Sequence, residues 1–170
     1  MKKLLVLLMI LGLGACSGSN STNNTVLLPE GFEGIIFVFY NIPGEEELQM
    51  EGDYTVIRVE QEALDELNAM GVKGFGTYFT STPDMKYGTV TDKYYYVNKG
   101  SHRTPINNDC IHLSGTGVIT TENGRDIPFS KMQVTGTNCT SNFNLRGSNE
   151  LSNKLSEVES YLLDYISYTY

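Results

Sequence analysis

Histidine is scarce in this chain, and the local motifs that usually identify an enzyme are missing. Only two of the 170 residues are histidine, His102 and His112. The sequence contains neither the G-x-S-x-G motif of serine hydrolases nor the H-E-x-x-H motif of zinc proteases. Ser101 or Ser114 could pair with a histidine, but no spacing fixes the geometry of such a pair. We therefore expect a protein that is not an enzyme, with a hydrolase as an alternative.

Basic residues are nearly absent from one acidic segment of the chain, residues 30–66. Residues 30–66 hold eleven acids and one base, Arg58, whereas acids and bases balance in residues 67–170. The net charge is −8, and it becomes −10 without residues 1–15. This charge argues against nucleic acid and against anionic lipid as partners. It permits a cationic partner, so an acidic inhibitor or immunity-type protein for a basic partner is a second alternative.

Long apolar runs are also absent, apart from one at the start of the chain. The run at residues 4–13 follows Lys2 and Lys3 and ends in the sequence LGAC at residues 13–16. A run of about ten residues is too short to span a bilayer core of about 30 Å as a helix. The order of basic, apolar and small residues is typical of an export signal.

The LGAC sequence resembles the lipobox of bacterial lipoproteins, in which the cysteine sulfur receives a diacylglycerol and the chain is cut before it. This resemblance implies a signal peptide at residues 1–15 and a lipid anchor, with acyl chains such as palmitate, on Cys16. An ordinary secretory signal that contains a cysteine is the alternative. Two or three acyl chains would anchor the protein stably.

The mature chain is predicted to consist of a tether and one domain. Residues 16–25 are rich in serine and asparagine, and such a segment should form a flexible tether. Residues 26–170 have the ordinary size of a single domain. We expect this domain on the cell membrane or outer membrane, facing the periplasm or the exterior. Its expected partners are the membrane, through Cys16, and an unknown envelope protein or glycan, without nucleic acid or a cofactor.

Apolar and alternating patterns predict strands through most of the domain. The run at residues 35–40 is entirely apolar or aromatic, so both of its faces should be covered. Residues 53–60 alternate between apolar and polar positions. We therefore predict an α+β fold that is mainly β, with an antiparallel β-sandwich of about seven strands. A short insert helix is predicted at residues 61–70, where apolar residues fall at helical spacing.

The end of the chain carries a helical pattern. Apolar residues step by four or three positions at Leu151, Leu155, Val158, Leu162 and Ile166. This stripe predicts a C-terminal helix at residues 149–168 that packs on a sheet face. A helix that binds a separate partner is the alternative.

A hairpin is predicted between the last two cysteines. Residues 123–124, Asn-Gly, are a strong signal for a two-residue turn. The resulting register pairs residues whose numbers sum to 247, which places Cys139 two residues beyond the position opposite Cys110. A bulge near residues 130–131 would bring that position one residue closer to Cys139.

Because exported chains favour oxidation, we predict a disulfide between Cys110 and Cys139. Two free thiols are one alternative. A zinc site that adds His102, Asp109 and His112 is another, but the spacing is not that of known zinc motifs. No metal site is therefore expected.

Four short sequences suggest a family. PEGFEG, NIPG, TSTP and DKYYYV, between residues 27 and 98, are similar to a family of small bacterial exported lipoproteins that carry a domain of unknown function. The resemblance implies no catalytic residues. The opening of the domain also looks like transthyretin-type β-sandwich modules. We expect an uncharacterised, lipid-anchored binding or structural module of the bacterial cell envelope.

Five residues form a possible binding patch: Glu45, Glu46, Glu47, Tyr94 and Tyr96. Strand alternation places the two tyrosines on one face, where they could bind a sugar or peptide. The three consecutive acids lack the interleaved glycine and carbonyl ligands of calcium loops. Packing across strands is the alternative for the tyrosines, and plain solvation is the alternative for the acids.

Overall fold

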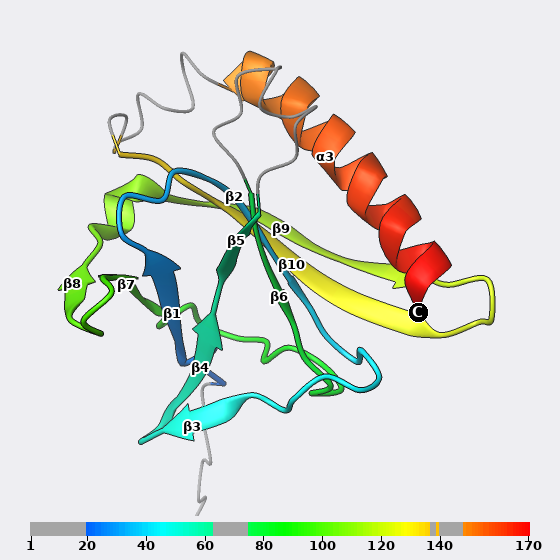
Figure 1. Ribbon diagram of the computed structural model, residues 1–170, viewed down its shortest axis with the longest axis horizontal. Coiled ribbons are helices and arrows are strands. Elements are labelled where there is room, and N and C mark those ends of the chain that lie inside the picture. Colours follow the sequence, from blue (N-terminus) through cyan, green and yellow to red (C-terminus); the bar gives the residue numbers. More distant parts are fainter. Residues whose placement is uncertain (1–19, 63–74, 137–138, 140–147) are drawn as a thin grey trace, which may run out of the picture.

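A computed structural model describes residues 20–62, 75–136, 139 and 148–170, and within them ten strands form two five-stranded sheets. The sheets pack face to face, and a long helix lies on the outer side of the second sheet (Figure 1). The first sheet has the order β3 (Gln49–Glu51), β4 (Tyr54–Arg58), β1 (Asn24–Pro29), β7 (Lys93–Val97) and β8 (Arg103–Pro105). The second has the order β5 (Glu60–Glu62), β6 (Phe75–Phe79), β2 (Gly34–Phe39), β10 (Asp126–Val134) and β9 (Ile111–Thr120). A 3₁₀ helix, η1 (Asn108–Cys110), precedes β9, and α3 (Ser148–Thr169) ends the chain.

Both sheets are mixed, so the prediction of an antiparallel sandwich of about seven strands is wrong in strand direction and strand number. β1 runs parallel to both of its neighbours, β4 and β7. β2 runs parallel to β6 and antiparallel to β10. The reason is that β1 and β2 are consecutive but lie in different sheets, so each pairs with strands from farther along the chain. The mainly β composition and the C-terminal helix are confirmed.

β2 is buried on both faces, as its apolar sequence predicted. Ile36 and Val38 face the core between the two sheets. Ile35, Phe37 and Phe39 face the core beneath α3. All five side chains are at most 1% exposed, so one central strand holds the two cores together.

The predicted C-terminal helix is present and packs on the second sheet. Val158, Leu162 and Ile166 are at most 3% exposed and contact the apolar residues of β2 and β10. Leu151 and Leu155 belong to the same predicted stripe, but their side chains lie outside the described part of α3.

The predicted strand at residues 53–60 is divided between the two sheets. Thr55 and Ile57 are buried in β4, as their alternation predicted. The N–H of Val59 donates to the carbonyl oxygen of Leu27 at 3.0 Å, and the chain then enters the second sheet as β5. β5 occupies the first residues of the predicted insert helix, and residues 63–70 of that prediction lie outside the described residues.

The β9–β10 hairpin turns through three residues, not the two that were predicted. Asp126 pairs with Thr120, and the N–H of Thr121 donates to the carbonyl oxygen of Arg125 at 2.9 Å. The loop is therefore residues 122–124, and Gly124 has a left-handed φ of 80°. This is the three-residue loop in which a turn is followed by a glycine bulge.

The predicted bulge in the second arm is also corrected. Ile127 and Phe129 face α3, whereas Met132 and Val134 face the core between the sheets. The apolar residues change from odd to even positions because both faces of β10 are covered, so no bulge on this strand is needed to explain the pattern. The register does shift after Lys131, but the extra residue lies on β9.

The fold begins earlier than the predicted domain start at residue 26. The N–H of Thr22 donates to the carbonyl oxygen of Thr89 at 3.0 Å. The N–H of Asn24, the first residue of β1, donates to the Asp92 carboxylate at 2.8 Å. Residues 20–25 of the predicted tether therefore belong to the described fold, whereas residues 16–19 lie outside it.

Candidate binding groove

The acidic loop that follows β2 is held in place by its backbone. The buried Thr80 donates its hydroxyl proton to the carbonyl oxygen of Glu46 at 2.7 Å, and the N–H of Ser81 donates to the same oxygen. The N–H of Leu48 donates to the Thr82 hydroxyl oxygen at 2.9 Å. These bonds tie the loop to the segment after β6 and fix the backbone from which the exposed glutamates project.

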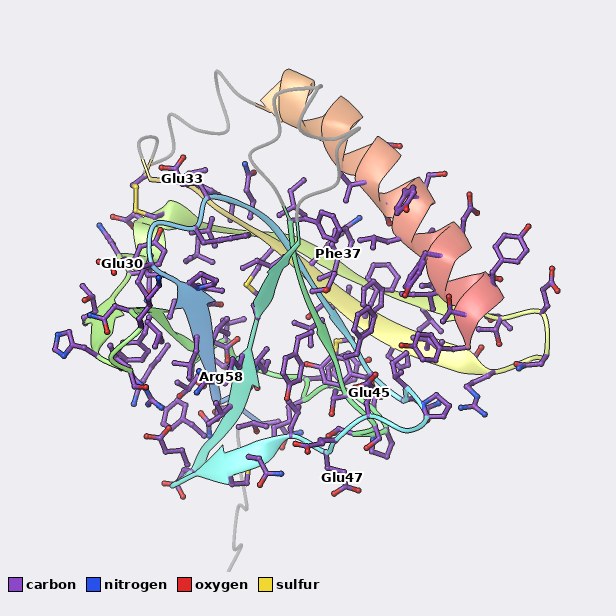
Figure 2. The ribbon with its side chains drawn as sticks, viewed as in Figure 1. Glu30, Glu33, Phe37, Glu45, Glu47 and Arg58 are labelled. Atoms are coloured by element: carbon purple, nitrogen blue, oxygen red, sulfur yellow. A yellow bond between two sulfur atoms is a disulfide. The ribbon has the colours of Figure 1, made fainter. Side chains whose placement is uncertain are left out.

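An open hollow of about 650 Å³ lies beside this loop, bordered by β3 and β4 of the first sheet and β6 of the second. We call it the acidic groove. It is lined by Glu45, Glu46, Gln49, Met50, Glu51, Val56, Arg58, Thr77, Tyr78 and Phe79. Arg58 comes from β4 and Glu45 from the loop that precedes β3 (Figure 2).

Carboxylates dominate the electrostatics of the groove. Among its described lining residues, three are acids and Arg58 is the only base. Burial raises the pKa of the Tyr78 phenol, and the carboxylates of Glu46 and Glu45 raise it further, while Arg58 lowers it. The ring of Tyr78 therefore lies in a partly buried position within the field of the acidic loop.

Two of the groove's carboxylates, those of Glu51 and Glu45, interact with residues outside the lining. Glu51 forms an ion pair with Arg103 of β8, with an N–O distance of 2.9 Å. The C-terminal Tyr170 lies beside Glu45, and burial followed by the Glu45 carboxylate raises the pKa of the Tyr170 phenol. Its ring also packs against Phe79, with ring centroids 6.2 Å apart. The end of the chain thus forms part of the groove's surroundings.

The side chains of the groove combine carboxylates with aromatic rings. Its described lining contains neither histidine, cysteine nor serine. Carboxylates attract cations, and the face of an aromatic ring attracts them as well. The arrangement can therefore hold a positively charged group against an aromatic wall.

The predicted binding patch does not form one surface. Glu45 and Glu46 line the groove, while Glu47 is exposed on the same loop, outside the lining (Figure 2). Tyr94 is only 5% exposed and belongs to the core between the sheets. Tyr96 packs against that core and donates its hydroxyl proton to the carbonyl oxygen of Phe32 at 2.9 Å. The predicted tyrosine pair therefore faces inward, where it packs.

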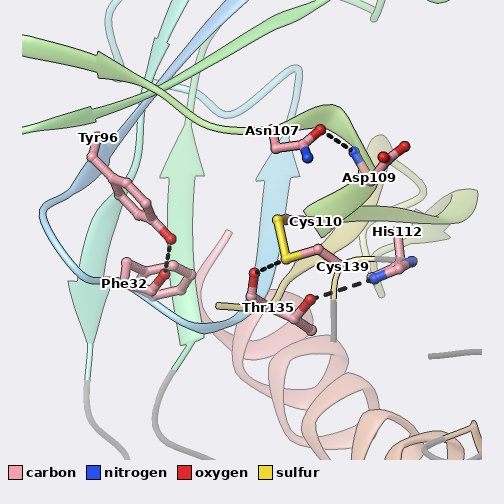
Figure 3. Close-up of a disulfide and its surroundings, with 8 residues drawn as sticks. All are labelled: Phe32, Tyr96, Asn107, Asp109, Cys110, His112, Thr135 and Cys139. Atoms are coloured by element: carbon pink, nitrogen blue, oxygen red, sulfur yellow. Dashed lines mark hydrogen bonds between the residues drawn. A yellow bond between two sulfur atoms is a disulfide. The ribbon is translucent and has the colours of Figure 1, made fainter. Parts of the chain in front are cut away.

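Cys110 and Cys139 form a disulfide, as predicted, through a register different from the predicted one (Figure 3). The N–H of Thr135 donates to the carbonyl oxygen of Cys110 at 3.0 Å, so Thr135 lies opposite this cysteine. The Cys139 sulfur lies 3.6 Å from the carbonyl oxygen of Thr135. Cys139, four residues after Thr135 in the sequence, therefore lies close enough to bond with Cys110.

The alternative zinc site would need free thiolates, but both of its cysteines are joined in the disulfide. Asp109 and His112 lie near that bond (Figure 3), and His102 is exposed. The His112 ring nitrogen lies 3.5 Å from the Thr135 hydroxyl (Figure 3). In the described ranges, no group of three or more His, Cys, Asp or Glu side chains could hold a metal ion.

Arg58, Tyr78 and Phe79 were not identified from the sequence as site residues. Arg58 is the one base of the acidic segment at residues 30–66, and this isolation is the only signal that could have indicated it. Tyr78 and Phe79 reach the groove because β6 pairs parallel with β2, which no local pattern reveals.

Comparisons with known proteins agree with an envelope module. A crystal structure described as that of a "putative lipoprotein" from Bacillus anthracis is 34% identical in sequence, with a TM-score of 0.63. The match covers 85% of this chain and 96% of that one. A comparison with curated proteins finds no match, and the likeness to transthyretin-type modules gains no support. No helix in the part of the chain that the structure describes is long and apolar enough to cross a membrane. Residues 20–143 match the family of unknown function DUF6843, and the chain belongs to this family.

Proposed function

We propose that this protein is a lipid-anchored, non-enzymatic module of the bacterial cell envelope that binds a cationic peptide segment in the acidic groove. The observation that carries the proposal is the fixed loop that presents Glu45 and Glu46 in a hollow that Arg58 and Tyr78 also line. Because hydrogen bonds already hold the loop's backbone, a ligand would not have to order it.

A peptide fits this groove better than a single ion. A volume of about 650 Å³ falls in the range of ligand sites, roughly 300–1,000 Å³. Lysine and arginine side chains can pair with carboxylates at one end and contact aromatic rings along their stems. Exposed ion pairs contribute only about 0.2–1 kcal/mol each, so we expect weak binding that falls with added salt.

The anchoring part of the proposal rests on the LGAC sequence and on the lipoprotein description of the Bacillus anthracis relative. Lipidation at Cys16 would hold the groove close to a membrane surface. A neutraliser of a basic envelope protein would use the same groove and is therefore the second candidate. The hydrolase alternative gains no support from the residues that line the groove.

The test measures binding of a fluorescein-labelled lysine-rich oligopeptide to residues 20–170 by fluorescence anisotropy, at several salt concentrations. The double variant E45Q/E46Q should weaken binding by roughly 2- to 30-fold, because two exposed ion pairs are removed. The control is E47Q/E122Q, which changes the net charge equally at exposed positions outside the groove lining.

Equal losses in both double variants would show attraction to overall charge and would contradict a groove site. The absence of saturable binding at low salt would do the same. For the second candidate, a purified basic envelope protein that shows salt-sensitive binding and loses it in E45Q/E46Q alone would identify the partner as a folded protein.

A further inference from the structure

The first described residues, 20–21, are hydrogen-bonded to the segment around Thr89. The N–H of Thr89 donates to the carbonyl oxygen of Asn20 at 2.9 Å, and Ser21 forms a parallel bridge with Thr89. A side chain at Gly88 would collide with the backbone of Asn20, because the two segments are in close contact there. Residues 20–21 therefore cannot swing freely away from the domain.

Three of the most exposed large apolar side chains gather around this point: Met50, Tyr87 and Val90, at 57%, 56% and 51% exposed. We call them the exit patch. Tyr87 and Val90 flank the segment that holds Asn20. Met50 lies near the start of β1 because it contacts Thr55, whose hydroxyl lies 3.6 Å from the Met50 sulfur. The N–H of Thr55 donates to the carbonyl oxygen of Asn23 at 2.9 Å, which places Met50 at the same end of the domain.

The distance from the anchor to this patch is short. Asn20 is the fourth residue after Cys16, and a fully extended chain spans at most about 3.6 Å per residue. Asn20 can therefore lie no more than about 14 Å from the Cys16 backbone. A lipid on Cys16 places that residue at the boundary of headgroups and acyl chains, a zone several ångströms deep.

We propose that the exit patch docks on the bilayer surface that holds the lipid anchor. This inference rests on the anchoring part of the proposed function. Tyrosine is enriched at the interface of membranes, because its ring is apolar and its hydroxyl is polar. The Tyr87 hydroxyl donates to the Asp84 carboxylate at 3.1 Å, and the Lys86 ammonium donates to the Thr55 hydroxyl at 2.8 Å. The charges of Asp84 and Lys86 are opposite, so uncharged phosphatidylcholine is a sufficient surface for docking.

The chain contains no tryptophan, which permits a direct test with single reporters. The lipidated protein carrying Tyr87→Trp, purified from membranes, is reconstituted into phosphatidylcholine vesicles with or without brominated acyl chains. Bromine quenches tryptophan by contact, so this reporter should be quenched and its emission shifted to the blue. Val90→Trp serves as a second reporter if the first variant has a lowered melting temperature. Tyr161→Trp, on the exposed side of α3, is the control and should stay unquenched.

Flotation of the vesicles separates the two proposals. If the protein floats with the vesicles but both patch reporters stay unquenched, the anchor holds and the docking is refuted. Quenching of Tyr161→Trp to the same extent would also refute docking through this patch. If the protein does not float, the anchoring itself fails, and the inference fails with it. Binding of the lysine-rich peptide to the groove is measured independently of these outcomes.

Discussion

Tyr40 and Tyr94 place phenol groups inside the core between the sheets. The two residues are 3% and 5% exposed. Burial raises the pKa of both phenols above the ordinary value of 10.0, and the nearby Asp92 carboxylate raises each pKa further. The folded state therefore keeps these protons at a pH where the unfolded chain has lost them. The stability that these groups contribute is complete below about pH 10 and is lost as the pH rises above it.

The first prediction concerns Tyr40. Tyr40→Phe should reduce the loss of unfolding free energy above about pH 10, because the unfolded chain then has one phenol fewer whose ionisation favours unfolding. Urea denaturation at a series of alkaline pH values measures this slope. Tyr168→Phe, at a side chain that is 81% exposed, should leave the slope as in the wild type. Identical slopes for Tyr40→Phe and the wild type would contradict the prediction.

The second prediction concerns the disulfide, which joins residues separated by 29 positions. Cys139→Ser should lower the unfolding free energy by roughly 2–4 kcal/mol, because the unfolded chain gains freedom when the loop is opened. Urea denaturation of the variant and the wild type, with and without reductant, measures the difference. Reduced wild-type protein should match the variant. Two reactive thiols in unreduced, denatured protein from the envelope would contradict the bond.

At the scale of elements, α3 connects the end of the chain to the second sheet. Leu162 and Ile166 insert into the cluster formed by the phenylalanines of β2 and β10. Phe37, Phe39 and Phe129 have ring centroids 5.8 to 6.4 Å apart in this cluster. The helix therefore covers an apolar face that water would otherwise reach.

The third prediction follows from this burial. Leu162→Ala and Ile166→Ala should each cost roughly 2–5 kcal/mol of unfolding free energy, because each leaves a cavity beneath the helix. Tyr161→Ala, at a position that is 45% exposed, should cost much less. Thermal and urea denaturation provide the measurements. If deleting residues 149–170 left the melting temperature unchanged, α3 would have to be a partner-binding element and not part of the core.

Sequence patterns predict which faces of these elements are buried better than they predict which strands pair with each other. The apolar run of β2, the alternation in β4 and the stripe of α3 each report burial, and burial depends on side chains along one segment. Strand order depends instead on long-range pairing, so the parallel pairs of β1 and the change of sheet at Val59 leave no local pattern. The predicted hairpin register was wrong by one turn residue, because an Asn-Gly sequence fits both a two-residue and a three-residue loop.

The candidate site follows the same rule. The composition indicated its charge, since residues 45 and 46 belong to the acidic segment at residues 30–66. The aromatic residues come from β6 and the base from β4. Only the packing of two sheets brings these segments together, so the sequence could indicate the acids but not the groove.

At the scale of the whole molecule, the two ends of the sandwich differ. β3 and the start of β1 lie at one end, and η1 lies near the other (Figure 1). Met50 belongs both to the exit patch and to the lining of the groove, so both features reach the end where β3 lies. An anchor before Asn20 would therefore bring that end toward the membrane and leave the disulfide on the far side.

The fourth prediction tests the anchor on which this orientation depends. Cys16→Ser should move the protein from the membrane fraction to the soluble fraction or leave its signal uncleaved, because no sulfur remains to receive the lipid. Fractionation and immunoblotting measure the distribution, and intact mass measures the modification. Cys139→Ser is the matched control: it removes a different cysteine and should leave the protein in the membrane fraction. Wild-type protein whose mass shows an unmodified chain, starting at a residue other than Cys16, would contradict lipidation and with it the short connection to the membrane.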